Sequence, residues 1–449
     1  MVFLWDAAEY QALGEMLHRQ GWRFFLSTGP HREPLYPLLV AQSLRLGELF
    51  ALPYQKVVVA IQFGLVAVTQ LLMIRLARLL AIPPWAALAA VAYFGLSPAV
   101  VNSACSMFSE VLAYPFVAAA ALGTTQAWQA SARGAIGRSA TLAAASGLAF
   151  AGGALTKGLL AYVGLLVAVF FGLRAALALR RGTHRPALAN SIVALIGLAL
   201  ALGTLHAYKA LNRHFNGNYE FTTRYVGMLY GNAAKRAMPM TARQLLAHLV
   251  AIPGGTVCQL LFTREECEFC EFGAADELWL TELPRRLEGV PPGERRAATL
   301  RLVREKVLEA PFRYAFVGLT QMLRLPFWES TQLGYVSYPP WLQRVWAAGA
   351  VRFGLRLLVG VATLAALGWA AWIAMGLLFR PSHPQPPFAP TLVLVAAFML
   401  LYAPYSVLTR YALPLAPLYL VLVAAMLARL ARRGAAAGAD ATRTTPRHP

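Results

Sequence analysis

Residues 159–179 read LLAYVGLLVAVFFGLRAALAL, an apolar run in which one arginine is the only charged residue. A run of roughly 20 apolar residues has the length that an α-helix needs to cross the hydrocarbon core of a membrane. Similar runs recur along the chain, separated by turn residues and arginines, and the alternating pattern of β-barrel strands is not seen. The stretch therefore predicts one crossing of an all-α polytopic membrane protein.

The composition of the 449-residue chain agrees with this prediction. Hydrophobic residues make up 58% of the chain and charged residues 13%, and the mean hydropathy is +0.53, far outside the range of soluble domains. The apolar runs predict about nine spans. They cover residues 57–80, 85–103, 111–128, 140–155, 159–179, 188–208, 355–378, 390–407 and 411–430.

Arginines predict the orientation of these spans, because short cytoplasmic loops retain Lys and Arg while translocated short loops lose them. The basic residues near the ends of the predicted spans fall on one side, for example Arg75, Arg138, Arg181, Arg380 and Arg433. We place that side in the cytoplasm of a bacterial inner membrane. The net charge of +20 is then an orientation signal that also suits anionic lipid headgroups, and it requires no nucleic acid.

This topology divides the chain into five parts. Residues 1–56 form a first outer loop, 57–208 six spans, and 209–353 a large periplasmic region with an interfacial helix. Residues 354–430 form three further spans, and 431–449 a disordered cytoplasmic tail rich in Ala, Gly and Thr.

The unusual polar residues gather in the outer parts. Asp6 and Glu9 begin an amphipathic stretch in which Tyr10, Leu13 and Leu17 form an apolar stripe, as expected for a helix lying in the interface. The following sequence HREPLYPLLV, residues 31–40, contains two prolines, which exclude a continuous helix.

Several short motifs then follow in one order. Asp6 stands after an apolar stub, and REPLYPLLVA (32–41), FSEVLAY (108–114), GGALTKGLL (152–160) and TRYALPLAPLYLVL (409–422) come later. In this order the chain resembles the GT-C glycosyltransferases of the protein O-mannosyltransferase and aminoarabinose transferase type. The resemblance covers nearly the whole chain, although each motif is short. It implies a GT-C-like helix bundle.

In the family that this chain resembles, the catalytic carboxylate is an acid on the first outer loop, immediately after the first transmembrane helix. The resemblance assigns this role to Asp6. The stub MVFLW is then expected to be the end of a first helix whose beginning is absent, and the intact molecule is expected to have about 10 spans.

The resemblance also implies a reaction, the inverting transfer of a sugar from a polyprenyl-phosphate carrier to a lipid, glycan or protein acceptor. Such a transfer needs a general base, cations or a metal at the phosphate leaving group, and an apolar groove for the carrier. Asp6 is the predicted base; the alternative is a solvated acid. Nucleotide sugars are not expected as donors, because they are scarce outside the cell.

Two further acids, Glu110 and Glu33, are candidates for binding the acceptor or a metal. For Glu110 the alternative is a structural acid in the first turn of a helix, where negative charge is favourable. A divalent metal is common in parts of the family, and the sequence contains no dedicated metal motif. We therefore predict the metal only as a cofactor that assists.

Four basic residues are candidates for the donor phosphate. Lys157 and Arg410 each lie in a short turn between two spans, and the alternative for both is an interfacial anchor. Arg32, next to Glu33, either pairs with that neighbour or borders the pocket. Arg224 belongs to NYEFTTRYVGMLYGN (218–232), whose aromatic and amide side chains suit sugar rings or pack against the membrane face.

Cys258, Cys267 and Cys270 lie in the large outer region. In an oxidising periplasm we expect one disulfide among them, and the sequence does not assign its pairing. A zinc site is disfavoured, because the CEFC motif has no second pair of ligands nearby.

Two rival functions remain open. A lipid-linked oligosaccharide polymerase or ligase would depend on arginines for a pyrophosphate rather than on an acid after the first helix. A flippase or secondary transporter would carry polar groups or broken helices at mid-membrane, whereas the candidates here lie at the ends of spans.

Overall fold

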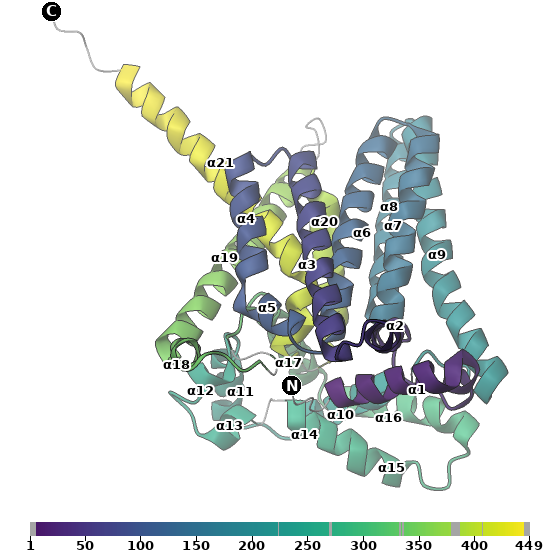
Figure 1. Cartoon of the computed structure of the whole chain (residues 1–449). Helices are drawn as coiled ribbons and strands as arrows, with labels where there is room; N and C mark the ends of the chain where they lie inside the picture. The colour runs from purple at the N-terminus through teal and green to yellow at the C-terminus, as the bar shows by residue number, and fades with distance from the viewer. Residues whose placement is uncertain are drawn as a thin grey trace, which may run out of the picture.

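The computed structural model describes residues 6–222, 224–268, 272–331, 334, 336–378, 387–405 and 407–443. Within these ranges every regular element is a helix (Figure 1). The predicted all-α fold is therefore confirmed.

Each predicted span falls on a helix or on a pair of helices, and together these elements form a bundle (Figure 1). They are α3 (Tyr54–Leu79), α4 (Pro84–Leu96) with α5 (Pro98–Ala104), α6 (Ser109–Ala132), α7 (Ile136–Thr156), α8 (Leu159–Arg180), α9 (His184–Asn216), α19 (Gly349–Leu378), α20 (Ala389–Tyr402) and α21 (Ala416–Arg443).

Length and composition support fewer crossings than the nine predicted. Among the described residues, six helices are long and apolar enough to cross a membrane, or seven if the bent pair of α4 and α5 is one span. Helix α6 is long enough but less apolar, and α20 has only 14 residues. Helix α20 ends at Tyr402, and Pro404, which has no backbone N–H to extend the helical hydrogen bonds, follows two residues later. The chain remains a polytopic membrane protein, as predicted.

The span predicted over 85–103 is a bent pair rather than one straight helix. Pro98 pushes Ser97 into an extended conformation, and α5 leaves α4 at an angle of 49°. The carboxylate of Glu329 fills the break: it accepts hydrogen bonds from the Tyr93 hydroxyl at 2.7 Å, the Ser97 hydroxyl at 2.8 Å and the Ala99 amide at 3.0 Å. The backbone groups freed by the bend are thereby partly satisfied.

Small residues let the bundle helices approach closely. A Cβ added to Gly123 of α6 would lie 2.8 Å from the Cβ of Ser146 on α7, closer than side-chain atoms tolerate. Without water-driven collapse between apolar helices in a bilayer, such close backbone packing is a main source of their association. The α6–α7 contact therefore depends on the missing side chain at position 123.

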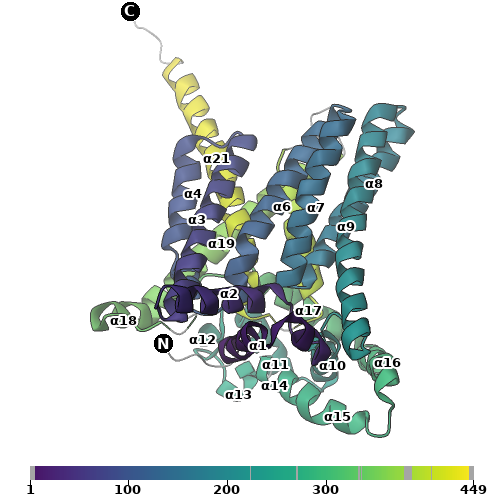
Figure 2. The ribbon, with the colours of Figure 1, turned by 45° about the vertical axis from the view of Figure 1, so that its right-hand side comes forward.

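Two helices lie across one end of the bundle instead of along it. These are α1 (Asp6–Ser27) and α2 (Leu35–Leu49), which run roughly perpendicular to the bundle (Figure 2). The apolar stripe predicted for α1 is confirmed, because Tyr10, Leu13 and Leu17 are all buried. Helix α1 therefore packs its apolar face on the bundle and leaves its polar face at the surface of this end.

The long segment between α9 and α19 folds at the same end of the bundle as α1 (Figure 1). Helix α17 has only 14 residues, too short for a crossing, as predicted for this region. The segment contains α10 (Arg224–Ala237), α11 (Ala242–Val250), α12 (Gly255–Cys258), α13 (Arg264–Glu268), α14 (Phe272–Glu277), η1 (Leu278–Glu282), α15 (Leu283–Arg286), η2 (Pro292–Glu294), α16 (Arg295–Glu309), α17 (Pro311–Arg324) and α18 (Pro340–Ala347).

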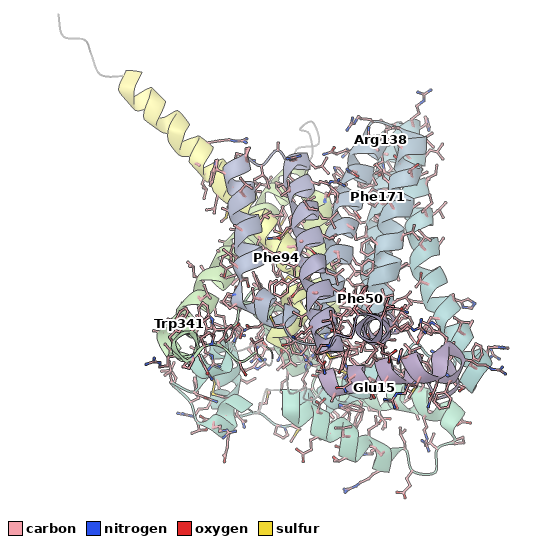
Figure 3. All side chains as sticks on the ribbon, in the orientation of Figure 1. Glu15, Phe50, Phe94, Arg138, Phe171 and Trp341 are labelled. Atoms are coloured by element: carbon pink, nitrogen blue, oxygen red, sulfur yellow. A yellow bond between two sulfur atoms is a disulfide. The ribbon has the colours of Figure 1, made fainter. Side chains whose placement is uncertain are left out.

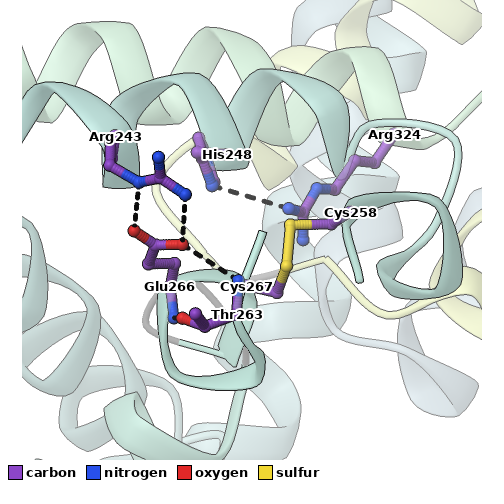
Figure 4. The surroundings of a disulfide bond; sticks show 7 residues. All are labelled: Arg243, His248, Cys258, Thr263, Glu266, Cys267 and Arg324. Carbon is purple, nitrogen blue, oxygen red and sulfur yellow. Dashed lines mark hydrogen bonds and ion pairs between the residues drawn. A yellow bond between two sulfur atoms is a disulfide. The ribbon is translucent and has the colours of Figure 1, made fainter. Parts of the chain in front are cut away.

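One disulfide closes a small lobe of this segment. Cys258 is bonded to Cys267, so the expected bridge forms (Figure 4); the third cysteine, Cys270, lies outside the described residues. Beside the disulfide, Arg243 pairs with Glu266 at 2.7 Å. Cys267, the first cysteine of the CEFC motif, therefore contributes a disulfide sulfur to this lobe.

The two ends of the bundle differ in the residues that they carry. Arg138 lies at the end away from α1, whereas Glu15 lies on α1 (Figure 3). The turns between α3 and α4, α6 and α7, and α8 and α9 share the end of Arg138 (Figure 1). This is the arrangement from which the sequence predicts orientation, and the orientation itself stays a prediction.

Candidate functional site

The first turn of α1 presents two carboxylates to a group of arginines. The Asp6 carboxylate accepts a hydrogen bond from Arg32 on one oxygen, Oδ1, and from Arg410 on the other, Oδ2. One turn later, Glu9 Oε2 lies 2.6 Å from Arg32 Nη2 and 3.4 Å from Arg224 Nη1. Because residues three apart share a face of a helix, the two acids form one acidic edge.

The three arginines come from segments that are far apart in the sequence. Arg32 lies in the loop between α1 and α2, Arg224 begins α10, and Arg410 belongs to the short 3₁₀ helix η3 (Thr409–Leu415). Arg224 Nη1 is also 4.0 Å from Asp6 Oδ1. We call Asp6, Glu9, Arg32, Arg224 and Arg410 the arginine–carboxylate cluster.

Aromatic rings support the arginines. The Arg32 guanidinium lies 4.7 Å from the centroid of the Tyr10 ring. The Arg410 guanidinium lies 5.3 Å from the Phe108 ring and 5.6 Å from the Tyr411 ring. Such cation–π contacts hold a guanidinium in place without neutralising its charge.

The arginines also change the acidity of Asp6. Burial by itself raises the pKa of this carboxyl, because the charged form loses water. The positive charges of Arg410, Arg32 and Arg224 outweigh burial and hold the pKa of Asp6 well below its usual range. Asp6 is therefore ionised at neutral pH and binds a proton weakly while these arginines surround it.

A second ion pair joins two other predicted residues. Lys157, in the turn between α7 and α8, donates to Glu110 Oε1 at 3.0 Å; the Glu110 side chain is buried and that of Lys157 is largely buried. Burial lowers the pKa of Lys157, but the adjacent Glu110 carboxylate together with Tyr402 and Tyr10 raises it, so the net shift is upward. The ammonium that the sequence assigns to a donor phosphate here contacts a carboxylate of the protein.

The Glu110–Lys157 pair lies next to the arginine–carboxylate cluster. Lys157 Nζ lies 5.5 Å from the centroid of the Tyr411 ring, which also borders Arg410. Tyr10, beneath Arg32, donates a hydrogen bond to the hydroxyl of Ser109 at 3.0 Å, immediately before Glu110. The start of α6 thus fixes both the Glu110–Lys157 pair and the ring that supports Arg32.

Glu33 does not pair with Arg32. Its carboxylate accepts hydrogen bonds from the Gly158 amide at 3.0 Å and from the Tyr225 hydroxyl. Gly158 follows Lys157 in the α7–α8 turn, and Tyr225 follows Arg224 in α10. Glu33 therefore ties the bundle to the helix that carries Arg224.

An apolar pocket adjoins this loop. Its volume is about 510 Å³, and Pro34, the residue after Glu33, forms part of its wall. It lies between the second half of α1 and the ends of α7 and α9. The lining residues are Trp22, Leu26, Pro34, Leu155, Thr204, Ala207, Tyr208 and Leu211.

The structure brings all the predicted site residues into this one region. It also brings Glu9, Tyr225 and Tyr411 into contact with these residues. The sequence indicates Glu9 only as part of the amphipathic stretch. A signal for Glu9 is present in the sequence, because it follows Asp6 by three residues. No comparable signal links Tyr225 to Glu33, since their contact depends on how α10 folds back over the bundle.

The carboxylates do not form an evident metal site. In the described ranges, no group of three or more His, Cys, Asp or Glu side chains could hold a metal ion. Asp6 and Glu9 instead contact guanidinium groups, which oppose a cation at the same oxygens. The divalent metal stays a prediction, and the reaction proposed below does not depend on it.

Comparison of the chain with protein-family models and with curated proteins gives no match. The similarity to GT-C enzymes consequently rests on the motifs quoted above. Because a fold does not by itself determine a function, the function must be argued from the geometry and charge of the site.

Proposed function

We propose that this protein is a membrane glycosyltransferase that moves a sugar from a polyprenyl-phosphate donor to an acceptor. The observation that supports this proposal most is the arginine–carboxylate cluster. Its three guanidinium groups face two carboxylates, so one positive charge is in excess at a surface where a lipid headgroup can lie. An anionic ligand is the natural partner of this excess charge.

The phosphate of the donor binds the three arginines. A guanidinium presents several N–H groups in a plane and can bind two phosphate oxygens at once. As the sugar leaves, negative charge grows on the phosphate oxygen, and cations that are already in position stabilise that charge. Arg32, Arg224 and Arg410 supply this stabilisation from three different segments.

The apolar pocket takes the isoprenoid chain of the donor. Its volume of about 510 Å³ falls in the range of small-molecule sites, and its walls are almost entirely apolar. Pro34 borders the pocket two residues after Arg32, so a lipid in the pocket can place its headgroup toward the cluster. An aqueous sugar nucleotide would gain nothing from these walls.

The transfer step inverts the anomeric carbon. The acceptor oxygen forms a bond to that carbon while the bond from the carbon to the phosphate oxygen breaks, and its electron pair stays on the phosphate. A carboxylate of the cluster takes the proton of the acceptor; the sequence predicts Asp6 for this role. Phosphate binding weakens the field of the arginines on Asp6, which raises the pKa of that carboxyl from its low value.

The surface that carries α1 faces the periplasm of a bacterial inner membrane in this proposal. Arg138 at the opposite end of the bundle, and the arginines that end α6 and α8, support this orientation. Lipid-linked sugars are the activated donors that suit that compartment.

The test uses the purified chain in liposomes with radiolabelled polyprenyl-phosphate sugars and native membranes as the source of acceptor. We expect label in a product with at least one donor. Asp6→Asn should lose more than 100-fold in rate, because this acid holds Arg32 and Arg410, and oriented charge at a leaving group contributes on the order of 10²–10³. Glu15→Gln, on the same helix, is the matched control, since Glu15 contacts Gln11 rather than an arginine.

Three results would contradict the proposal. Full activity of Asp6→Asn would favour the polymerase or ligase reading, which needs the arginines but not this acid. Movement of a labelled lipid-linked sugar across the liposome membrane without covalent transfer would identify a transporter. An absence of transfer with every donor would also count against a glycosyltransferase.

A further inference from the structure

We infer that Glu9, rather than Asp6, is the carboxylate that takes the proton from the acceptor. This inference rests on the proposed function and names the base of that reaction. It follows from how the oxygens of the two acids are used, and from which of them an incoming molecule can reach.

Both oxygens of Asp6 already receive arginine hydrogens. Arg32 donates to Oδ1 and Arg410 donates to Oδ2, and the side chain is only 20% exposed. A general base must direct a lone pair at the proton that it abstracts. In Asp6 the lone pairs nearest to the cluster are used to hold two guanidinium groups, so this acid is built to position the arginines.

Glu9 has the opposite arrangement. Both of its arginine contacts involve one oxygen, Oε2, and among the described residues no donor reaches Oε1. Its side chain is 44% exposed, more than twice the fraction for Asp6. Oε1 is therefore an open acceptor at the surface of the cluster.

The position of Glu9 also suits the geometry of the transfer. Its carboxylate and that of Asp6 share one nitrogen, Nη2, of Arg32. A phosphate bound to the arginines therefore lies within one guanidinium of Glu9, and an acceptor hydroxyl at Oε1 can meet the anomeric carbon attached to that phosphate. The charged and titratable groups that face Glu9 are Arg32, Arg224, Asp6 and His31.

The step balances without a further reactant. The acceptor proton moves to Glu9 Oε1 as the acceptor oxygen bonds to the anomeric carbon. The electron pair of the broken carbon–oxygen bond remains on the phosphate, where Arg32, Arg224 and Arg410 bind the added charge. Solvent then removes the proton from Glu9, because this side chain is exposed.

The experiment compares Glu9→Gln with Asp6→Asn in the liposome assay, using a polyprenyl-phosphate sugar that supports transfer. We expect Glu9→Gln to lower kcat by about 100-fold or more with KM for the donor within about threefold, since a positioned base contributes on the order of 10²–10⁴. Asp6→Asn is expected to raise KM as well, because the arginines lose their anchor. Added formate should restore part of the rate of Glu9→Ala but not of Asp6→Ala.

Glu15→Gln again serves as the control, and the melting temperature of each variant in detergent checks its fold. The inference is overturned if Glu9→Gln keeps more than a third of the wild-type kcat. It is also overturned if Glu9→Gln raises KM alone, because Glu9 would then only position the arginines. Either result leaves the proposed function standing. Absence of transfer by the wild type with every donor would instead contradict both the inference and the proposed function.

Discussion

The arginine–carboxylate cluster and the Glu110–Lys157 pair are both ionic, yet they differ in charge balance and exposure. In the pair, one carboxylate meets one ammonium at 3.0 Å, and the side chains are 4% and 14% exposed. In the cluster, three guanidinium groups meet two carboxylates, and the side chains of Glu9 and Arg224 are 44% and 36% exposed. The pair is neutral and largely buried. The cluster is positive and open only at Glu9 and Arg224, because the side chains of Asp6, Arg32 and Arg410 are 20%, 9% and 17% exposed.

This difference distinguishes an ion pair suited to stabilising the fold from a cluster suited to binding a ligand. Removal of either partner of a buried ion pair destabilises the fold, because the remaining ion is left without water or a counter-charge. A cluster with excess charge and an exposed edge can accept an anionic ligand, and the ion pairs at that edge contribute little to stability. Lys157 and Arg410, two sequence candidates for the same phosphate, therefore receive different expectations although both border the Tyr411 ring.

The largest effect is expected when the pair is broken. Lys157→Met leaves the Glu110 carboxylate buried and uncompensated, which costs about 3–5 kcal/mol of folding free energy. Unfolding in detergent, followed by heat or denaturant, measures this loss. The double variant Lys157→Met/Glu110→Gln removes the charge as well and should recover most of it. A single variant as stable as the wild type would show that the pair is not structural.

The next effect concerns catalysis. In the proposed reaction, Arg410→Ala removes one of three cations from the leaving phosphate and should lower the transfer rate by on the order of 10²–10³. Arg410→Lys keeps the charge but not the planar donor geometry, so its rate should be intermediate. The liposome assay measures both. If Arg410→Ala lost stability to the extent of Lys157→Met while its folded fraction transferred sugar normally, the contrast between the two charged groups would fail.

A smaller effect is expected from the link between Glu33 and α10. Tyr225→Phe removes a hydrogen bond to a carboxylate, worth about 1.5–3 kcal/mol, and loosens the helix that begins with Arg224. We expect KM for the donor to rise about tenfold with kcat nearly unchanged. Tyr230→Phe is the matched control, because this tyrosine of α10 binds Glu282, away from the cluster. Equal effects of the two substitutions would exclude a specific role for Tyr225.

The smallest effect is a dependence of stability on pH. The folded-state pKa of Asp6 lies below its unfolded value of about 3.9, so its ionised form stabilises the fold above that pH, and this contribution is lost as pH falls toward the folded pKa. The stability advantage of the wild type over Asp6→Asn should therefore shrink between about pH 5 and about pH 3. Melting curves of both proteins over this range measure it, and a constant difference would show that the arginines do not act on Asp6.

Much of the fold was accessible from local sequence, and the exceptions have local or packing causes. The stripe of Tyr10, Leu13 and Leu17 predicts an amphipathic helix lying in the interface, and in the folded chain all three side chains are buried. The bend at Ser97 is also encoded locally, by Pro98, but an apolar run of that length reads as one straight span. The position of Glu329 in that bend could not be predicted from the sequence, because this acid lies 232 residues beyond Ser97.

For the candidate site, residue types were predictable and partners were not. Asp6 and Arg410 stand out as charges at the ends of apolar runs, yet 404 residues separate them, and nothing in the sequence links one to the other. The sequence likewise leaves Arg32 and Glu33 open to pairing as neighbours. In the folded chain they contact different partners: Arg32 binds the acids of α1, and Glu33 binds the α7–α8 turn and Tyr225 of α10.

The sequence by itself determined which segments are helical and apolar, because a helix satisfies its own backbone hydrogen bonds and its length must match the membrane. Only the tertiary structure decided that Lys157 belongs to Glu110, that three arginines surround Asp6, and that one oxygen of Glu9 stays open. Charge pairing depends on distances of a few ångströms between side chains, and helix packing sets those distances.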